Sequence, residues 1–146
     1  MRLTPDDVAC WVLKSRTAPG ELVPGWRPGP VQALRRCVHP TYRLSLVAPG
    51  QRCLLWVSGR HVAGVHAIGV VTAGPVVGDA GPEVGLGLHL LEEPVPRGEL
   101  VAERGLAAAE VLRAPFGSNP SYLTAEQLRV VVSRLAPADL RAAGWT

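Results

Sequence analysis

The chain has 146 residues, of which 47% are hydrophobic and 18% charged, and its net charge at pH 7 is +3. These values are typical of one globular domain, long enough to bury about 70% of its unfolded surface without disulfides or metals. Its apolar runs fall short of the roughly 20 residues that span a bilayer, and its first residues lack a signal-peptide pattern. We therefore expect a single cytoplasmic domain over residues 1–146, away from membranes.

The first 47 residues predict one strand and a long loop. An apolar run over residues 8–15 predicts a strand that ends in polar residues, among them Lys14 and Ser15. Residues 17–30 contain four prolines and three glycines, so we expect a loop there that carries Trp26. Residues 32–37 predict a short helix. Residues 42–47 alternate weakly and form either a strand or a covering segment.

Residues 49–75 are the predicted centre of the fold. A Pro-Gly turn opens an apolar run over residues 53–57, Ser58 and Gly59 interrupt it, and an alternating run follows over residues 62–72. This pattern indicates two adjacent buried strands, with Trp56, Ser58 and Gly59 at one rim of the sheet, where binding residues commonly lie. Residues 83–91 predict a further strand whose glycines indicate close backbone approach or a bulge, and residues 92–98 predict a connector.

The last third of the chain predicts short helices. Residues 99–112 are rich in Ala, Leu and Glu and predict helices interrupted near Gly105. Two prolines and a Gly-Ser-Asn cluster exclude regular structure from residues 115–122. Thr124 and Gln127 form a predicted capping box for a helix with one apolar face. The tail adds one turn, and we expect Trp145 to dock against the rest of the protein.

Cysteine and histidine are too scattered to indicate a metal site. The three cysteines include no CxxC pair, and two of them lie in apolar, strand-like runs. They are typical of buried small side chains in a reducing compartment. The four histidines show neither HxH nor HExxH spacing. We expect no metal and no cofactor.

Positive charge is concentrated in the first half of the chain. The sequence has fourteen arginines and one lysine, and no acidic residue occurs between Glu21 and Asp79. Clustered arginines on one face contact the phosphates of a nucleic acid. The alternative is a solvated surface that reflects only an Arg-rich composition. The candidate backbone-contacting residues are Arg27, Arg35, Arg36 and Arg43.

Four motifs in this order resemble the EVE domains, which belong to the PUA-like superfamily and are related to YTH domains. The motifs are WxxKS from Trp11, PGxxxxLWVSG from Pro49, GVxAIG from Gly64 and PxGSNPSxLTxEQ from Pro115. They cover about residues 10–135. The resemblance implies an α+β fold, with a PUA-like mixed sheet or pseudo-barrel and short peripheral helices. It also implies a pocket that accepts a flipped and often modified base of DNA or RNA.

Stacking on an aromatic side chain returns about 1–3 kcal/mol of the few kcal/mol that flipping a base costs. Trp26 and Trp56 are the candidate stacking walls, and each is alternatively part of the core. Two residues are candidates to read the base edge: Lys14, the only lysine, and Asn119, the only asparagine. The alternative for Asn119 is that it only shapes its loop. The candidate ligand-binding residues are Lys14, Ser15, Trp26, Trp56, Ser58, Gly59, Ser118, Asn119 and Pro120.

Two other function classes compete with a modified-base reader. The related ASCH domains include amidohydrolases that act on acetylated nucleosides with Lys, Thr and Glu. The GxKxxTxR-like signature is absent here, and the only glutamate of the first half is Glu21, in the predicted loop. A protein-interaction adaptor is the third class. We expect a nucleic-acid-binding module rather than an enzyme, because no catalytic constellation stands out.

Overall fold

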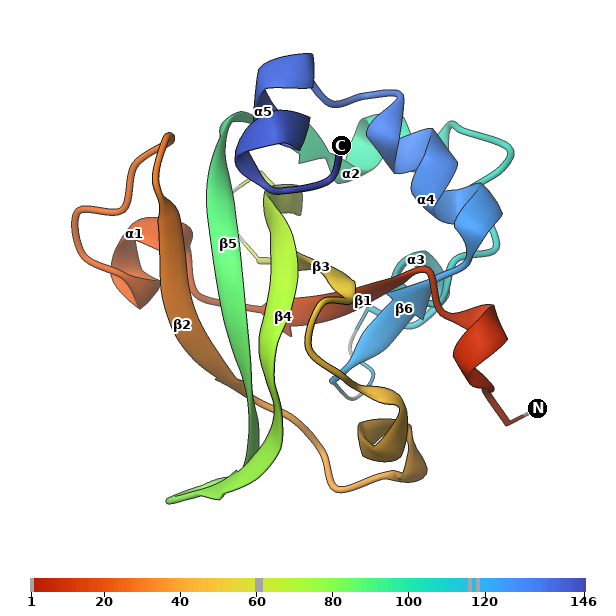
Figure 1. Cartoon of the computed structure of the whole chain (residues 1–146). Helices are drawn as coiled ribbons and strands as arrows, with labels where there is room; N and C mark the ends of the chain where they lie inside the picture. The colour runs from red at the N-terminus through yellow and green to blue at the C-terminus, as the bar shows by residue number, and fades with distance from the viewer. Residues whose placement is uncertain (1, 60–61, 116, 118) are drawn as a thin grey trace.

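The computed structural model describes residues 2–59, 62–115, 117 and 119–146. Within these ranges the strands join one mixed sheet in the order β2-β5-β4-β3-β1-β6 (Figure 1). Its strands are β1 (Cys10–Ser15), β2 (Val31–Cys37), β3 (Arg52–Val57), β4 (Gly64–Gly78), β5 (Gly81–Pro96) and β6 (Ser121–Leu123). β1 is parallel to β3, and the other neighbouring pairs are antiparallel.

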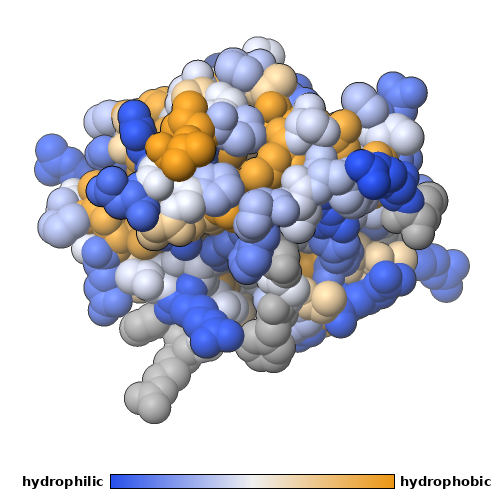
Figure 2. Space-filling view, turned by 90° about the horizontal axis from the view of Figure 1, so that it is seen from below, coloured by the Kyte–Doolittle hydropathy of each residue, from blue (hydrophilic) through white to orange (hydrophobic). Residues whose placement is uncertain are grey.

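Short helices surround this sheet, so the architecture is α+β. The α-helices are α1 (Pro19–Leu22), α2 (Arg97–Val101), α3 (Glu110–Arg113), α4 (Ala125–Val132) and α5 (Pro137–Ala142); η1 (Pro5–Asp7) and η2 (Tyr42–Leu46) are 3-10 helices. Among the described residues, no helix is long and apolar enough to cross a membrane. Figure 2 shows the underside of the molecule, where hydrophilic side chains are interspersed with apolar ones.

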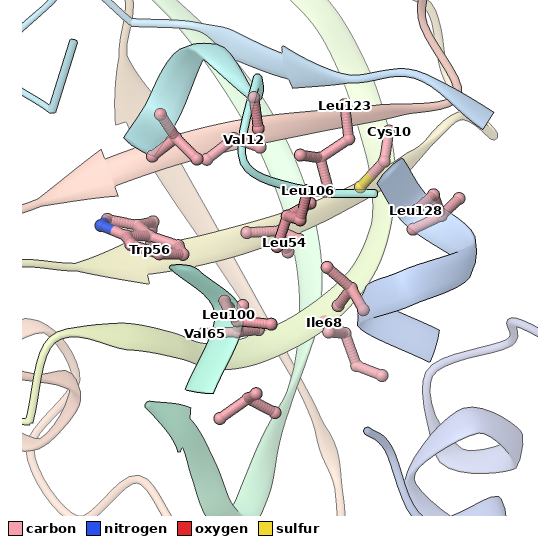
Figure 3. Packing of buried hydrophobic residues seen from close by; sticks show 14 of the residues in the cluster. Cys10, Val12, Leu54, Trp56, Val65, Ile68, Leu100, Leu106, Leu123 and Leu128 are labelled. Atoms are coloured by element: carbon pink, nitrogen blue, oxygen red, sulfur yellow. The ribbon is translucent and has the colours of Figure 1, made fainter. Parts of the chain in front are cut away.

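Alternation along the strands gives the sheet two apolar faces. Cys10 and Val12 of β1 belong to a helix-side cluster, which also contains residues of α2, α3 and α4 (Figure 3). Trp11 and Leu13 point the other way, into a strand-side cluster that Val38 and Val47 also join. Side chains of neighbouring residues in a strand point to opposite faces, so this short strand is buried on both sides.

The sheet is strongly bent, so that β2, β5 and β4 run across β1 and β6 (Figure 1). Glycines allow the close approach that this requires. A Cβ atom on Gly69 of β4 would lie 1.8 Å from the carbonyl oxygen of Gly87 in β5. The predicted close backbone approach in the glycine-rich strand is therefore confirmed, and the β4–β5 pairing also shows register shifts of the kind that a bulge produces.

Several sequence-based predictions are confirmed. The strand ending at Ser15 and the antiparallel pair on either side of Ser58 are present as β1, β3 and β4. Helices interrupted around Gly105 are present as α2 and α3. The capping box of α4 forms as expected, since the Thr124 hydroxyl accepts from the backbone N–H of Gln127. Trp145 docks on the sheet, where its indole N–H donates to the Gly69 carbonyl oxygen at 2.7 Å.

Other predictions are wrong. Residues 32–37 form a strand, β2, not a helix, because they pair along their whole length with β5 and alternate in exposure at the sheet edge. Six residues make too few helical hydrogen bonds to resist such pairing. Residues 42–46 form a 3-10 helix and not a strand, and Leu44 and Leu46 pack against the strand-side cluster, so only the alternative of a covering segment is confirmed. Residues 92–96 continue β5 instead of forming a connector, and Ser121 and Tyr122 belong to β6, although we excluded regular structure from residues 115–122.

Candidate functional site

The candidate site begins where β1 ends, and it joins residues from both halves of the chain. β6 pairs with β1 only as far as Val12. Beyond that point the side chain of Asn119 forms the hydrogen bonds to β1 that a paired strand would form. Its Oδ1 accepts from the backbone N–H of Lys14 at 2.7 Å, and its Nδ2 donates to the Lys14 carbonyl oxygen at 3.0 Å. The amide of Asn119 is thus committed to the β1 backbone, which favours the loop-shaping interpretation of this residue.

Lys14 contributes a buried positive charge to this site. Its side chain is buried, and its ammonium group donates to the Gly117 carbonyl oxygen at 2.6 Å. Burial lowers the pKa of Lys14 from its ordinary value, while the nearby Glu110 carboxylate acts in the opposite direction. An ammonium group has three N–H donors. One of them is bound to Gly117, so the cation has further donors for a ligand.

Two serines stand beside Lys14. The Ser15 hydroxyl is engaged locally, since it donates to the Thr17 carbonyl oxygen at 2.9 Å and accepts from the Thr17 backbone N–H at 3.0 Å. The backbone N–H of Ser58 donates to the Ser15 carbonyl oxygen at 2.9 Å, which holds the β3 end against β1. Gly59 follows with a φ of 106° and is exposed, so glycine is favoured at this turn.

Two neighbouring hollows flank this segment. The smaller measures about 130 Å³ and is lined by Lys14, Ser15, Arg16, Ser58, Pro115, Gly117 and Asn119. The larger measures about 440 Å³ and is lined by Thr41, Tyr42, Arg43, Glu110, Arg113, Ala114, Gly117, Asn119 and Pro120. Gly117 and Asn119 line both. The structure therefore brings the predicted Lys14, Ser15, Ser58 and Asn119 together, and it places Pro120 beside them; Ser118 lies outside the described residues.

The two tryptophans do not line either hollow. Trp56 is only 2% exposed and lies in the helix-side cluster, with its indole nitrogen at the cluster's outer end (Figure 3). Its alternative assignment to the core is correct, because Val12, Leu54 and Val65 of neighbouring strands belong to the same cluster. Trp26 is half-buried against the strand-side cluster, and its indole N–H is buried without a hydrogen-bond partner among the described residues.

The four candidate arginines divide into two pairs. Arg27 is exposed, and the Arg35 side chain is 72% exposed with a long contact of 4.0 Å to Glu83. Arg36 instead turns inward and donates to the Lys14 carbonyl oxygen at 3.3 Å. Arg43 forms two hydrogen bonds of 2.7 Å to the Glu110 carboxylate. Two of the four arginines are therefore engaged inside the protein, although no acidic residue lies near them in the sequence.

The cluster around Glu110 escaped the sequence-based reasoning. Its carboxylate accepts from both terminal nitrogens of Arg43 and from the Ser121 hydroxyl at 2.8 Å. The hydrogen bond from Arg43 holds the pKa of Glu110 below its usual value. Arg43 also donates to the Pro120 carbonyl oxygen at 3.0 Å. No local pattern signals a pair separated by 67 residues.

Solved structures share this fold. A hypothetical protein from Leishmania major superposes with a TM-score of 0.69 and 13% identity, covering 90% of this chain and 96% of its own. A Pseudomonas putida protein gives a TM-score of 0.66 and 17% identity, covering 86% and 98%. No protein-family model and no curated protein matches the sequence.

The fold has the mixed sheet and short peripheral helices that the motifs predicted. Human THYN1, solved in complex with DNA that contains 5-methylcytosine, superposes with a TM-score of 0.63 and 14% identity, covering 86% of this chain and 96% of THYN1. At this level of identity the likeness concerns the fold. It supports the EVE-type resemblance of the four motifs at the level of architecture.

Proposed function

We propose that this protein is an EVE-type nucleic-acid-binding module that accepts a flipped, modified base in the smaller hollow. The observation that carries this proposal is the buried Lys14 ammonium at the wall of a polar hollow, at the end of β1. A flipped base is read by hydrogen bonds along its edge, and Lys14 offers donors for the oxygens of that edge. The Ser58 hydroxyl makes only a long hydrogen bond of 3.5 Å to the Ser15 carbonyl oxygen, which a ligand oxygen can replace. The shared fold with THYN1, whose structure contains DNA with 5-methylcytosine, supports a nucleic-acid ligand.

In this proposal Trp26 contacts the nucleic acid outside the smaller hollow, because it does not line that hollow, and Trp56 has no contact with the ligand, because it is core. The Trp26 indole N–H is a buried donor without a partner among the described residues, and such a group costs free energy until an acceptor reaches it. A nucleic acid carries acceptors on its bases and phosphates. Arg27 and Arg35, whose side chains are exposed, take the backbone contacts; Arg36 and Arg43 are engaged inside the protein.

Binding is favoured over catalysis by the state of Glu110. The structure brings this carboxylate into electrostatic range of Lys14, which is a pairing that an amidohydrolase would use. Its oxygens, however, already accept from Arg43 and Ser121, and its lowered pKa makes it a weak general base near neutral pH. Incubation with acetylated nucleosides should therefore return them unchanged.

The decisive experiment is a titration of single-stranded oligonucleotides with and without 5-methylcytosine, in DNA and RNA, at two salt concentrations. We expect salt-dependent binding and a preference for a modified strand. Lys14→Met keeps the aliphatic stem, removes the ammonium group and should weaken the preferred strand by about 10- to 100-fold, the loss expected for a charge-assisted hydrogen bond.

Arg141→Ala, an exposed cation of α5, is the matched control and should bind almost normally. Circular dichroism must show that both variants are folded. If the wild-type protein binds no oligonucleotide at low salt, the proposal is wrong. If Lys14→Met binds the preferred strand as tightly as the wild-type protein does, the base is bound at another place.

A further inference from the structure

The larger hollow has no role in the function proposed above, although it lies against the smaller one. Three separate segments form its wall: η2 with the residue before it, the end of α3, and the segment that leads into β6. Its volume of about 440 Å³ falls within the usual range of about 300–1,000 Å³ for ligand sites, whereas the 130 Å³ of the smaller hollow does not. A ligand that filled only the smaller hollow would leave most of this concave surface empty.

The charges around the larger hollow favour an anion. Arg43 and Glu110 compensate each other through two hydrogen bonds of 2.7 Å. Arg113 lies at the rim, is exposed, and has no ion-pair partner among the described residues. Behind the wall, the Lys14 ammonium group donates to the Gly117 carbonyl oxygen. Arg43, Arg113 and Lys14 are three positive charges, and Glu110 is the one carboxylate within the described lining. The surroundings therefore carry a net charge of two positive units.

The rest of the lining is suited to a ring rather than to a small ion alone. Tyr42 is held from two sides: its hydroxyl accepts from the Leu3 backbone N–H at 2.8 Å, and the Arg2 guanidinium lies 4.1 Å from its ring centroid. Ala114 and Pro120 add apolar surface beside it. A fixed aromatic ring next to an exposed guanidinium group fits a sugar or base joined to a phosphate.

We propose that the larger hollow holds the nucleotide next to the flipped base, with Arg113 on its phosphate and Tyr42 against its sugar or base. The inference rests on the proposed function, because it takes the smaller hollow as the base pocket. The shared wall of Gly117 and Asn119 places the two hollows side by side, as neighbouring nucleotides of one strand require. The strand would then cross the segment that leads into β6.

The test compares the nucleoside 5-methyldeoxycytidine with two dinucleotides that add thymidine, through one phosphate, on its 5′ or its 3′ side. In the wild-type protein one dinucleotide should bind about tenfold more tightly than the nucleoside, since it adds a charge-assisted phosphate contact. In Arg113→Ala and Arg113→Gln this ratio should fall close to one, and Tyr42→Leu should lower it in part. Arg141→Ala should keep the wild-type ratio.

The results separate the two proposals. A dinucleotide advantage that survives both Arg113 variants and Tyr42→Leu overturns the inference and leaves the base pocket standing. An equal affinity of the wild-type protein for all three compounds also overturns it. Failure of the wild-type protein to bind any modified oligonucleotide overturns the proposed function and this inference with it. Thermal unfolding of each variant ensures that a lost advantage reflects the contact, because Arg113 is exposed and its removal should leave the fold intact.

Discussion

At the scale of single residues, polar side chains at the end of β1 are used to hold the chain together. Asn119 forms hydrogen bonds with both backbone groups of Lys14, and Glu110 accepts hydrogen bonds from Arg43 and Ser121. Gln51 does the same near Trp11: its Oε1 accepts from the Trp11 indole N–H, while its Nε2 donates to the Leu46 carbonyl oxygen at 3.0 Å. A carboxylate at position 51 would lack the donor to the Leu46 carbonyl oxygen, so both ends of the Gln51 amide have a structural use.

Glu110→Gln tests the cluster beside the site. The folded protein holds the pKa of Glu110 low, so its stabilising contribution is fully present above the unfolded value of about 4.3 and is lost as pH falls through the folded value. We expect the variant to lose about 1–3 kcal/mol at pH 7. Below pH 4 the difference from the wild-type protein should shrink, as measured by urea unfolding at several pH values.

Glu99→Gln is the control, since Glu99 forms a more exposed ion pair with Arg134. Such surface pairs contribute little, so its stability should change only slightly at any pH. A pH-independent loss in Glu110→Gln would mean that lost packing, rather than the charge, explains the effect.

At the scale of elements, the long hairpin of β4 and β5 depends on glycines where the strands come closest. Residues with strong local patterns were predictable: the apolar runs of β1 and β3, and the capping box of α4. β2 was not predictable. Its alternation is one of exposure in the folded protein, at a sheet edge, and its partner β5 is about 50 residues away in the sequence. Long-range pairing overrides weak local preference in such a segment.

Gly69→Ala measures the close approach within the hairpin. Its Cβ atom would meet the Gly87 carbonyl oxygen at 1.8 Å, which only a shift of the two strands relieves. We expect the free energy of unfolding to fall by about 1–3 kcal/mol, measured by thermal or denaturant unfolding. Gly74→Ala, in the same strand, is the control: the nearest atom to its Cβ, the Val47 carbonyl oxygen, lies at 3.7 Å. Equal effects at both positions would show that chain entropy, not contact, dominates.

At the scale of the whole molecule, the sequence predicted the architecture, a mixed sheet with short peripheral helices, better than the site. The four motifs identify strand ends and turns, and these are where the fold brings the chain together. The distribution of charge was harder to predict, because Arg43 finds Glu110 and Arg35 approaches Glu83 only after folding. Trp56 shows the same limit, since a rim position along a strand does not reveal which face is covered by helices.

The double variant Arg27→Ala with Arg35→Ala tests the charge distribution. Each phosphate contact that is lost should lower the slope of log affinity against log salt by about one, with modified and unmodified strands affected equally. Oligonucleotide titrations over a range of salt concentrations measure this. Arg43→Ala should instead lower the melting temperature, because it leaves Glu110 without its partner. An unchanged slope in the double variant would show that the backbone runs over another face.

The position of β1 within the sheet also has a consequence for how the protein is made. β1 lies between β3 and β6, and β2 pairs only with β5. During synthesis neither of the first two strands therefore finds a neighbour until residues 52–57 have emerged, and β2 waits until residues 83–89 follow. The apolar β1 segment must remain unpaired on the ribosome for that time, and we expect chaperone contacts or arrested, aggregation-prone nascent chains to be concentrated before β3 is complete.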